Sequence, residues 1–279
     1  MSNKDVRPMD AAQRNLRFRA YFKVSLLAMA VVLVVGFFYA CQVSSAGKLD
    51  PKDVDLIQFR LPADDATVAI FETTEGSFKA VIYEDQVPNF TKYFKELVGE
   101  QYYDDTYVFA VQKDVYFMGG SKADDGTNTD DTDTKKIEPE LSADLWPFKG
   151  ALVSYGDKGG TIFSRKIMSG SRILFVNSVE FTQEFMDELD SAGGNEELVE
   201  AFKEKGGVPN FSQQYTVFGQ VYDGMEVYDK ICGAEVKDEK SLKPKKEIKI
   251  KSVKLSTYGE NRNDGFFTLS EQDSSSKSE

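Results

Sequence analysis

The chain has 279 residues, of which 41% are hydrophobic, so it is long enough for one large globular domain or two small ones. It contains no histidine and only two cysteines, which excludes Ser-His-Asp and Cys-His catalysis, a disulfide framework and most zinc sites. Its net charge of −12 argues against nucleic-acid binding, because phosphates select basic surfaces. We therefore expect no metal, no other cofactor and no nucleic-acid partner.

The N-terminal part of the chain has the features of a membrane segment. Six Lys or Arg and two acidic residues lie in residues 1–41, and an uncharged apolar run of seventeen residues extends from Val24 to Ala40. This length is at the short end for crossing a bilayer, and aromatic residues flank it. We predict a transmembrane anchor over residues 24–41. The positive charge of residues 1–23 predicts that this end is cytoplasmic and that the main domain is extracytoplasmic.

A cleaved signal peptide would need a site of small residues, which the four residues 38–41 supply only in part. Two other fates of this segment are compatible with the residues at its end. The first is an uncleaved single-pass anchor in the cell membrane. The second is a lipoprotein, in which Cys41 becomes the lipidated N-terminus. Phe38 and Tyr39 fit a lipoprotein box poorly, so we favour the anchor. Residues 42–65 are polar and predict a linker, whereas residues 259–279 are Ser-rich and acidic and predict a disordered tail. One domain, residues 66–258, lies between them.

The first half of this domain alternates strand-like runs with one clear helix. The runs at 66–71 and 77–83 predict a hairpin whose turn uses Gly76. Pro88 begins an amphipathic helix that ends at Gly99. Two more short strands are expected within 101–120, and further strands at 151–155 and 172–176. An aspartate-rich run at 123–134 has oxygen ligands for Ca²⁺ but lacks the EF-hand spacing, so a solvated loop is favoured.

The second half begins with an insertion and ends with the most informative segment of the chain. Residues 181–207 predict two helices, capped by Thr182 and Asn195. The seventeen residues from Tyr215 to Ile231 predict a strand over 216–221, a turn at Asp223-Gly224 and a helix from Met225. The alternating run at 246–256 has one phase slip, which predicts a β-bulge. Many short strands and few helices predict a mainly β fold, a closed antiparallel barrel with flanking helices.

Taken in chain order, these landmarks resemble the cyclophilin family of peptidyl-prolyl isomerases over nearly the whole of residues 66–258. In that family a Pro-headed helix is followed by a tyrosine-aspartate turn, a Gly-Gly pair, a Gly-Ser pair before a strand, and a long segment ending in Asp-Lys-Ile. The corresponding residues here are Pro88, Tyr103-Asp104, Gly119-Gly120, Gly170-Ser171 and Val217–Ile231. The resemblance implies a cyclophilin-like barrel.

The same resemblance identifies the positions of the catalytic groove. Family members speed rotation about an X-Pro bond with an arginine that hydrogen-bonds toward the prolyl nitrogen, a glutamine partner and an apolar pocket. The arginine position falls on Ala110, which has no donor, and the glutamine position falls on Met118. The remaining groove positions are Val115, Tyr116, Arg172, Leu174, Asn210, Phe211 and Tyr215. Arg172 is the one candidate for a catalytic charge in the groove; the alternative is a surface arginine at the start of a strand.

Three functions are compatible with this pattern. The chain is either a foldase that isomerises X-Pro bonds through a rearranged site using Arg172, or a non-catalytic module that binds polypeptide segments or a membrane-complex protein, or a structural protein with a filled groove. Because the scaffold positions match the family while the chemical positions do not, we favour polypeptide binding with weak or lost isomerase activity.

Overall fold

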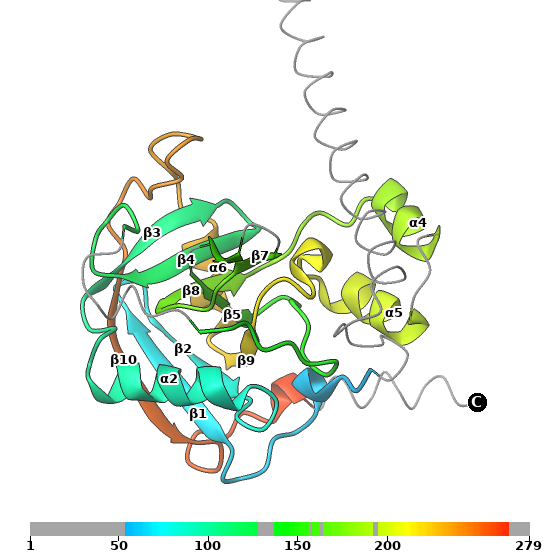
Figure 1. The fold of residues 1–279 in the computed structure, drawn as a ribbon, viewed down its shortest axis with the longest axis horizontal. Helices are drawn as coiled ribbons and strands as arrows, with labels where there is room; N and C mark the ends of the chain where they lie inside the picture. The colour runs from blue at the N-terminus through cyan, green and yellow to red at the C-terminus, as the bar shows by residue number, and fades with distance from the viewer. Residues whose placement is uncertain (1–53, 128–136, 157, 162–163, 192–194, 268–279) are drawn as a thin grey trace, which may run out of the picture.

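The computed structural model describes residues 54–127, 137–156, 158–161, 164–191 and 195–267 (Figure 1). The predicted membrane anchor, the segment that precedes it and most of the aspartate-rich run lie outside these ranges. Within the described ranges, no helix combines the length and the apolar character that a membrane span needs.

Eight strands form a closed antiparallel barrel, as predicted. The order around the barrel is β1-β10-β3-β4-β8-β5-β9-β2, so pairing of the first strand with the last one closes it. The strands are β1 (Thr67–Thr73), β2 (Ser77–Ile82), β3 (Thr106–Gln112), β4 (Tyr116–Ser121), β5 (Ala151–Tyr155), β8 (Arg172–Val176), β9 (Val217–Asp223) and β10 (Lys249–Thr257). A separate hairpin consists of β6 (Lys158–Thr161) and β7 (Ser164–Ile167).

Local sequence signals produce the predicted turns and the predicted bulge. Gly76 joins β1 to β2 with a φ of 136°, and Gly224 follows β9 with a φ of 78°, both in the region that favours glycine. On β10, Ser252 pairs with Glu72 whereas Ile250 pairs with Thr73, so one residue is left over. This extra residue is the β-bulge that the phase slip predicted.

Two helices pack their apolar faces against the barrel. From α2 (Pro88–Gly99), the rings of Phe90 and Phe94 lie 4.8 and 5.1 Å from that of Phe218 on β9. From α6 (Met225–Cys232), Tyr228 contacts the inward-facing rings of β2, β4 and β8, and its hydroxyl donates to the Val176 carbonyl at 2.6 Å. These contacts make one continuous core of apolar side chains.

The first turn of α2 is completed by a distant residue. Both oxygens of the Glu140 carboxylate accept hydrogen bonds from this turn, one from the Asn89 backbone N–H at 3.2 Å and the other from the Phe90 N–H at 2.7 Å. The Glu140 N–H in turn donates to Thr216 Oγ1 at 2.9 Å. The loop that carries Glu140 therefore connects α2 with the start of β9.

The predicted insertion folds as two helices beside the barrel, on the right of Figure 1: α4 (Gln183–Ser191) and α5 (Glu196–Lys205). The predicted caps are confirmed, because Thr182 Oγ1 accepts from the Phe185 N–H and Asn195 Oδ1 accepts from the Leu198 N–H. One-turn 3₁₀ helices, η2 (Ile57–Phe59) and η3 (Pro209–Phe211), lie at other points of the chain.

The packed region extends beyond the predicted domain bounds at both ends. Gln58, in the segment predicted as a linker, is 0% exposed. Its Nε2 donates to the Trp146 carbonyl at 3.0 Å and to Gln220 Oε1 at 2.9 Å, and its Oε1 accepts from the Trp146 N–H at 2.6 Å. At the other end, Phe267 is buried against Tyr222 and Tyr258. The parts of the linker and tail nearest the barrel are therefore integral to the fold.

Candidate functional site

The outer face of strands β3, β4, β8 and β5 carries most of the predicted groove residues. Ala110 pairs with Met118, Met118 with Leu174, and Leu174 with Val153. Residues directly opposite each other in a ladder point to the same face, so these four side chains form one row across the sheet. The neighbouring rings of Phe117 and Phe175 stack at 4.4 Å inside the barrel, so the row faces outward.

We call Ala110, Met118 and Leu174 the groove floor. Met118 is 8% exposed and Leu174 is 3% exposed, while Ala110 is half-buried. All three side chains are apolar, and the position implied for the catalytic arginine carries only a methyl group. The floor can pack against an apolar group but has no side-chain donor to offer an amide nitrogen.

Four aromatic rings in a row, which we call the aromatic rim, border this floor. Tyr116 lies on β4, two residues from Met118 on the same face, and its ring centroid is 5.8 Å from that of Phe211. Phe211 is 5.6 Å from Tyr215, and Tyr215 is 6.3 Å from Tyr155. Sequence reasoning identified Tyr116, Phe211 and Tyr215 but missed Tyr155. The strand register, in which Tyr155 pairs with Arg172, is what brings this fourth ring to the groove.

Tyr116 and Tyr215 of the rim remain neutral at ordinary pH. Burial raises the pKa of Tyr116 and of Tyr215, and the nearby Tyr155 hydroxyl raises both pKa values further. These phenols therefore offer hydroxyl groups that can donate or accept hydrogen bonds, and they add no charge to the groove.

Arg172 is packed rather than presented to solvent. Its side chain is buried, with the residue 8% exposed, and Nη1 donates to the Gly126 carbonyl at 2.8 Å. Its guanidinium carbon lies 5.4 Å from the centre of the Tyr155 ring, within cation–π range. Two strand spacings of roughly 4.8 Å and a two-residue offset of about 6.6 Å put the Arg172 and Ala110 Cα atoms on the order of 12 Å apart. The arginine therefore holds the loop that contains Gly126 and supports one side of the rim.

Two predicted groove residues lie at the margins. Val115 is half-buried in the turn between β3 and β4, where its N–H donates to the Gln112 carbonyl at 2.9 Å. Asn210 lies in η3, and its Oδ1 is buried without a hydrogen-bond partner among the described residues. Both belong to the edge of the site, next to the aromatic rim in sequence.

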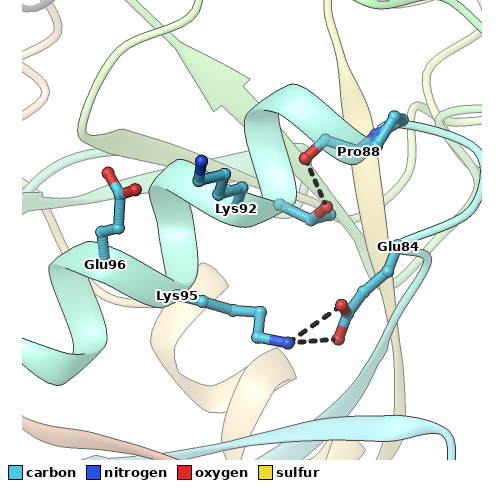
Figure 2. Close-up of a pocket in the computed structure, with 6 residues that line it drawn as sticks. Glu84, Pro88, Lys92, Lys95 and Glu96 are labelled. Atoms are coloured by element: carbon cyan, nitrogen blue, oxygen red, sulfur yellow. Dashed lines mark hydrogen bonds and ion pairs between the residues drawn. The ribbon is translucent and has the colours of Figure 1, made fainter.

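A hollow of about 430 Å³ lies on the exposed side of α2 (Figure 2) and contains none of the predicted groove residues. Its charges largely neutralise one another, because Lys95 Nζ lies 2.9 Å from both oxygens of Glu84. Lys92 and Glu96 extend from the same helix and are exposed. Across the described ranges, no group of three or more Cys, Asp or Glu side chains is arranged to hold a metal. The outer-face groove is therefore the better candidate site.

Comparison with known proteins identifies the family. A model described as cyclophilin type peptidyl-prolyl cis-trans isomerase/CLD matches residues 68–255, which is more than half of the chain. The chain belongs to this family. The region that matches the cyclophilin-type model runs from β1 to β10 and includes all residues of the groove floor and the aromatic rim.

Relatives agree with this assignment. A candidate peptidyl-prolyl cis-trans isomerase of Staphylococcus aureus is 26% identical over 184 residues, covering 66% of this chain and 89% of that protein. A candidate bifunctional phosphatase/peptidyl-prolyl cis-trans isomerase of Streptococcus pyogenes is 26% identical over 222 residues, which cover 79% of this chain but only 44% of that longer protein. A crystal structure of a cyclophilin type isomerase from Cryptosporidium parvum has a TM-score of 0.51 and 18% identity, covering 69% of this chain and 98% of that one. At this identity, the similarity to the Cryptosporidium parvum structure shows that the two chains share the fold.

Proposed function

We propose that this cyclophilin-type chain binds polypeptide segments in its outer-face groove and that its isomerase activity is lost or far below that of a catalytically intact relative. The observation that carries the proposal is the groove floor, where the implied arginine and glutamine positions are Ala110 and Met118. An apolar floor beside a rim of aromatic rings suits contact with peptide side chains and backbone, while the groups that act on the prolyl nitrogen are missing.

The size of the expected loss follows from the chemistry. Isomerisation passes through a twisted amide, and a preorganised donor at the nitrogen stabilises that state. Removing one such donor typically costs about 3 kcal/mol, which is roughly a hundredfold or more in rate. With both donors absent, we expect turnover near that of the uncatalysed reaction.

The competing proposal is an active isomerase that uses Arg172. Family membership and the names of the relatives favour it. It requires the guanidinium to leave the Gly126 carbonyl and the Tyr155 ring and to reach across two strands toward Ala110. Its cost is the loss of a buried charge-assisted hydrogen bond, which argues for the binding function instead.

The two proposals predict opposite results for one set of variants. Turnover is measured on a proline-containing peptide with the full-length chain, Arg172→Ala, Ala110→Arg and, as a matched control, the exposed Arg262→Ala. Background turnover in the unaltered chain, unchanged by Arg172→Ala and not restored by Ala110→Arg, supports a groove used for binding. Turnover close to that of an ordinary cyclophilin, abolished by Arg172→Ala but not by Arg262→Ala, overturns the proposal.

We further propose that this domain works outside the cytoplasm while tied to the cell membrane, with a polypeptide or a membrane-complex protein as its partner. The support is the basic segment 1–23 followed by the apolar run 24–40. Protease added to spheroplasts should digest residues 66–258, and protection until lysis would refute the orientation. Incorporation of labelled palmitate would identify Cys41 as a lipidation site instead of part of a plain anchor.

A further inference from the structure

The aromatic rim contains one half-buried ring, that of Phe211, which comes from η3 and not from a barrel strand. Phe211 ends the one-turn helix η3, and its ring lies between those of Tyr116 and Tyr215. It packs against the buried cluster that includes Met118 and Leu174. Residues 209–215, which we call the groove segment, therefore supply an apolar side chain to the site where a bound peptide would supply one.

Several polar atoms of the groove segment lack hydrogen-bond partners when the Phe211 ring is packed on the core, the arrangement that we call the closed state. Three of its polar atoms, Asn210 Oδ1, Ser212 Oγ and Gln213 Oε1, are buried and have no hydrogen-bond partner among the described residues. Ser212 is only 2% exposed, so its hydroxyl is shielded from bulk solvent. Buried polar atoms without partners are costly, and a cluster of them needs an explanation.

The backbone of the same segment is also strained. Gln213 has a φ of 58°, in the left-handed region that residues with a side chain beyond hydrogen rarely adopt. The next turn is held by a long hydrogen bond, from the Gln214 N–H to the Phe211 carbonyl at 3.4 Å, and by a second one from Gln214 Nε2 to the Asn210 carbonyl. Packing of the Phe211 ring thus stabilises the closed state, whereas the unpartnered polar atoms and the left-handed backbone of Gln213 destabilise it.

We propose that Phe211 is a displaceable internal occupant of the groove, and that the ligand is a polypeptide segment whose own aromatic side chain takes its place. When the groove segment lifts, its three unpartnered atoms become hydrated and Gln213 relaxes, while Met118 and Leu174 lose their cover. An aromatic residue of the ligand restores that cover between Tyr116 and Tyr215, and a proline is not required. The identity of this ligand rests on the proposed binding function; the lifting of the segment does not.

Lifting is tested without a ligand, by thiol labelling of the full-length chain with Cys41→Ser and Met118→Cys. The native Cys232 is an internal control, because it is 0% exposed at the end of α6 and burial raises the pKa of its thiol to about 12. We expect the thiol introduced by Met118→Cys to react faster than Cys232. Adding Phe211→Ala should accelerate it severalfold, up to about tenfold, since half-burial of a Phe side chain contributes about half of the roughly 1.5–3 kcal/mol that full burial gives.

Matched variants separate lifting from general loosening. Phe266→Ala removes another half-buried ring that packs on the core through Phe267, and it should leave labelling of the groove floor unchanged. Gln213→Gly relieves the left-handed strain and should slow labelling. If Phe211→Ala fails to fold, two other variants still test the proposal: Phe211→Leu should speed labelling of the groove thiol, and Gln213→Gly should slow it. Equal rates for the groove thiol and Cys232, unaffected by these changes, would overturn the proposal.

Peptide binding then tests the ligand class. The probe is an unstructured peptide with one phenylalanine and one proline, together with versions in which either residue is replaced by alanine. We expect Phe211→Ala to tighten binding about tenfold, because the competing ring is gone, and we expect loss of the peptide phenylalanine to weaken it more than loss of the proline. Binding that weakens in Phe211→Ala, or that depends only on the proline, overturns the internal-occupant proposal while the binding function stands. If no peptide binds to either form, the binding function and the aromatic ligand both fail, and labelling alone decides whether the segment lifts.

Discussion

Replacement of Gln58 by leucine removes the side chain that joins the N-terminal segment to the barrel. The change keeps the volume similar but deletes three hydrogen bonds. The Trp146 carbonyl keeps a second donor, the Phe148 N–H, so two buried groups lose their partner: the Trp146 N–H and Gln220 Oε1. At about 1–3 kcal/mol for each unsatisfied group, and with some gain from the apolar leucine, we expect a loss of about 3 kcal/mol in the free energy of unfolding. For a domain of this size that corresponds to a fall in Tm of roughly 6–12 °C.

The assay is urea unfolding of the full-length chain, followed by the fluorescence of Trp146, the only tryptophan. Because Trp146 bonds directly to Gln58, the same signal reports any local loosening before the main transition. Gln112→Leu, at an exposed position on β3, is the matched control and should change stability by less than about 0.5 kcal/mol. If Gln58→Leu behaves like this control, the N-terminal segment does not contribute to the fold as we infer.

Three further predictions concern other parts of the fold. Hydrogen bonds from Lys230 and Lys246 lower the pKa of Glu75, so Glu75→Gln should reduce stability near neutral pH. Measured as the free energy of unfolding against pH, the difference from the unaltered chain should vanish as the pH falls through the lowered pKa. Glu140→Ala removes the cap of α2 and should cost about 1 kcal/mol in urea unfolding, whereas a change in helix content without a change in midpoint would contradict the capping role. Gly224→Ala should cost more than about 1 kcal/mol in thermal unfolding, because φ is 78° and the added Cβ would lie 2.4 Å from a backbone oxygen; a neutral result would refute the strain.

Features specified by neighbouring residues were predictable from the sequence. Glycine is favoured where a strand turns sharply into a helix through a residue with positive φ, as at Gly224. The side chain of Asn195 accepts a hydrogen bond from the backbone N–H three residues later. The bulge on β10 appeared as a break in the alternation of apolar residues, because side chains on a strand switch faces at every residue. In each case the cause and its signal lie within a few positions of each other.

Features specified by distant partners were not predictable in this way. Gln58 lies in a polar stretch with no periodicity, and its partners are 88 and 162 residues away. Tyr155 was assigned to a strand, but only the pairing of β5 with β8 shows that its ring joins the groove. The burial of Arg172 likewise depends on a loop carbonyl 46 residues earlier. A single sequence contains these residues but no record of the register that brings them together.

Closure of the barrel by its first and last strands determines when this chain can fold. β1 pairs with β10, and the paired residues are 177 to 190 positions apart, so the sheet has two open edges until the C-terminal strand is available. Such long-range pairing is slow, and unpaired strand edges invite association with other chains. A chain emerging from a ribosome or a translocation pore therefore stays unfolded and accessible to chaperones and proteases until almost all of it has appeared. Any truncation that removes β10 should yield a species that is degraded or aggregates, whatever remains of the groove.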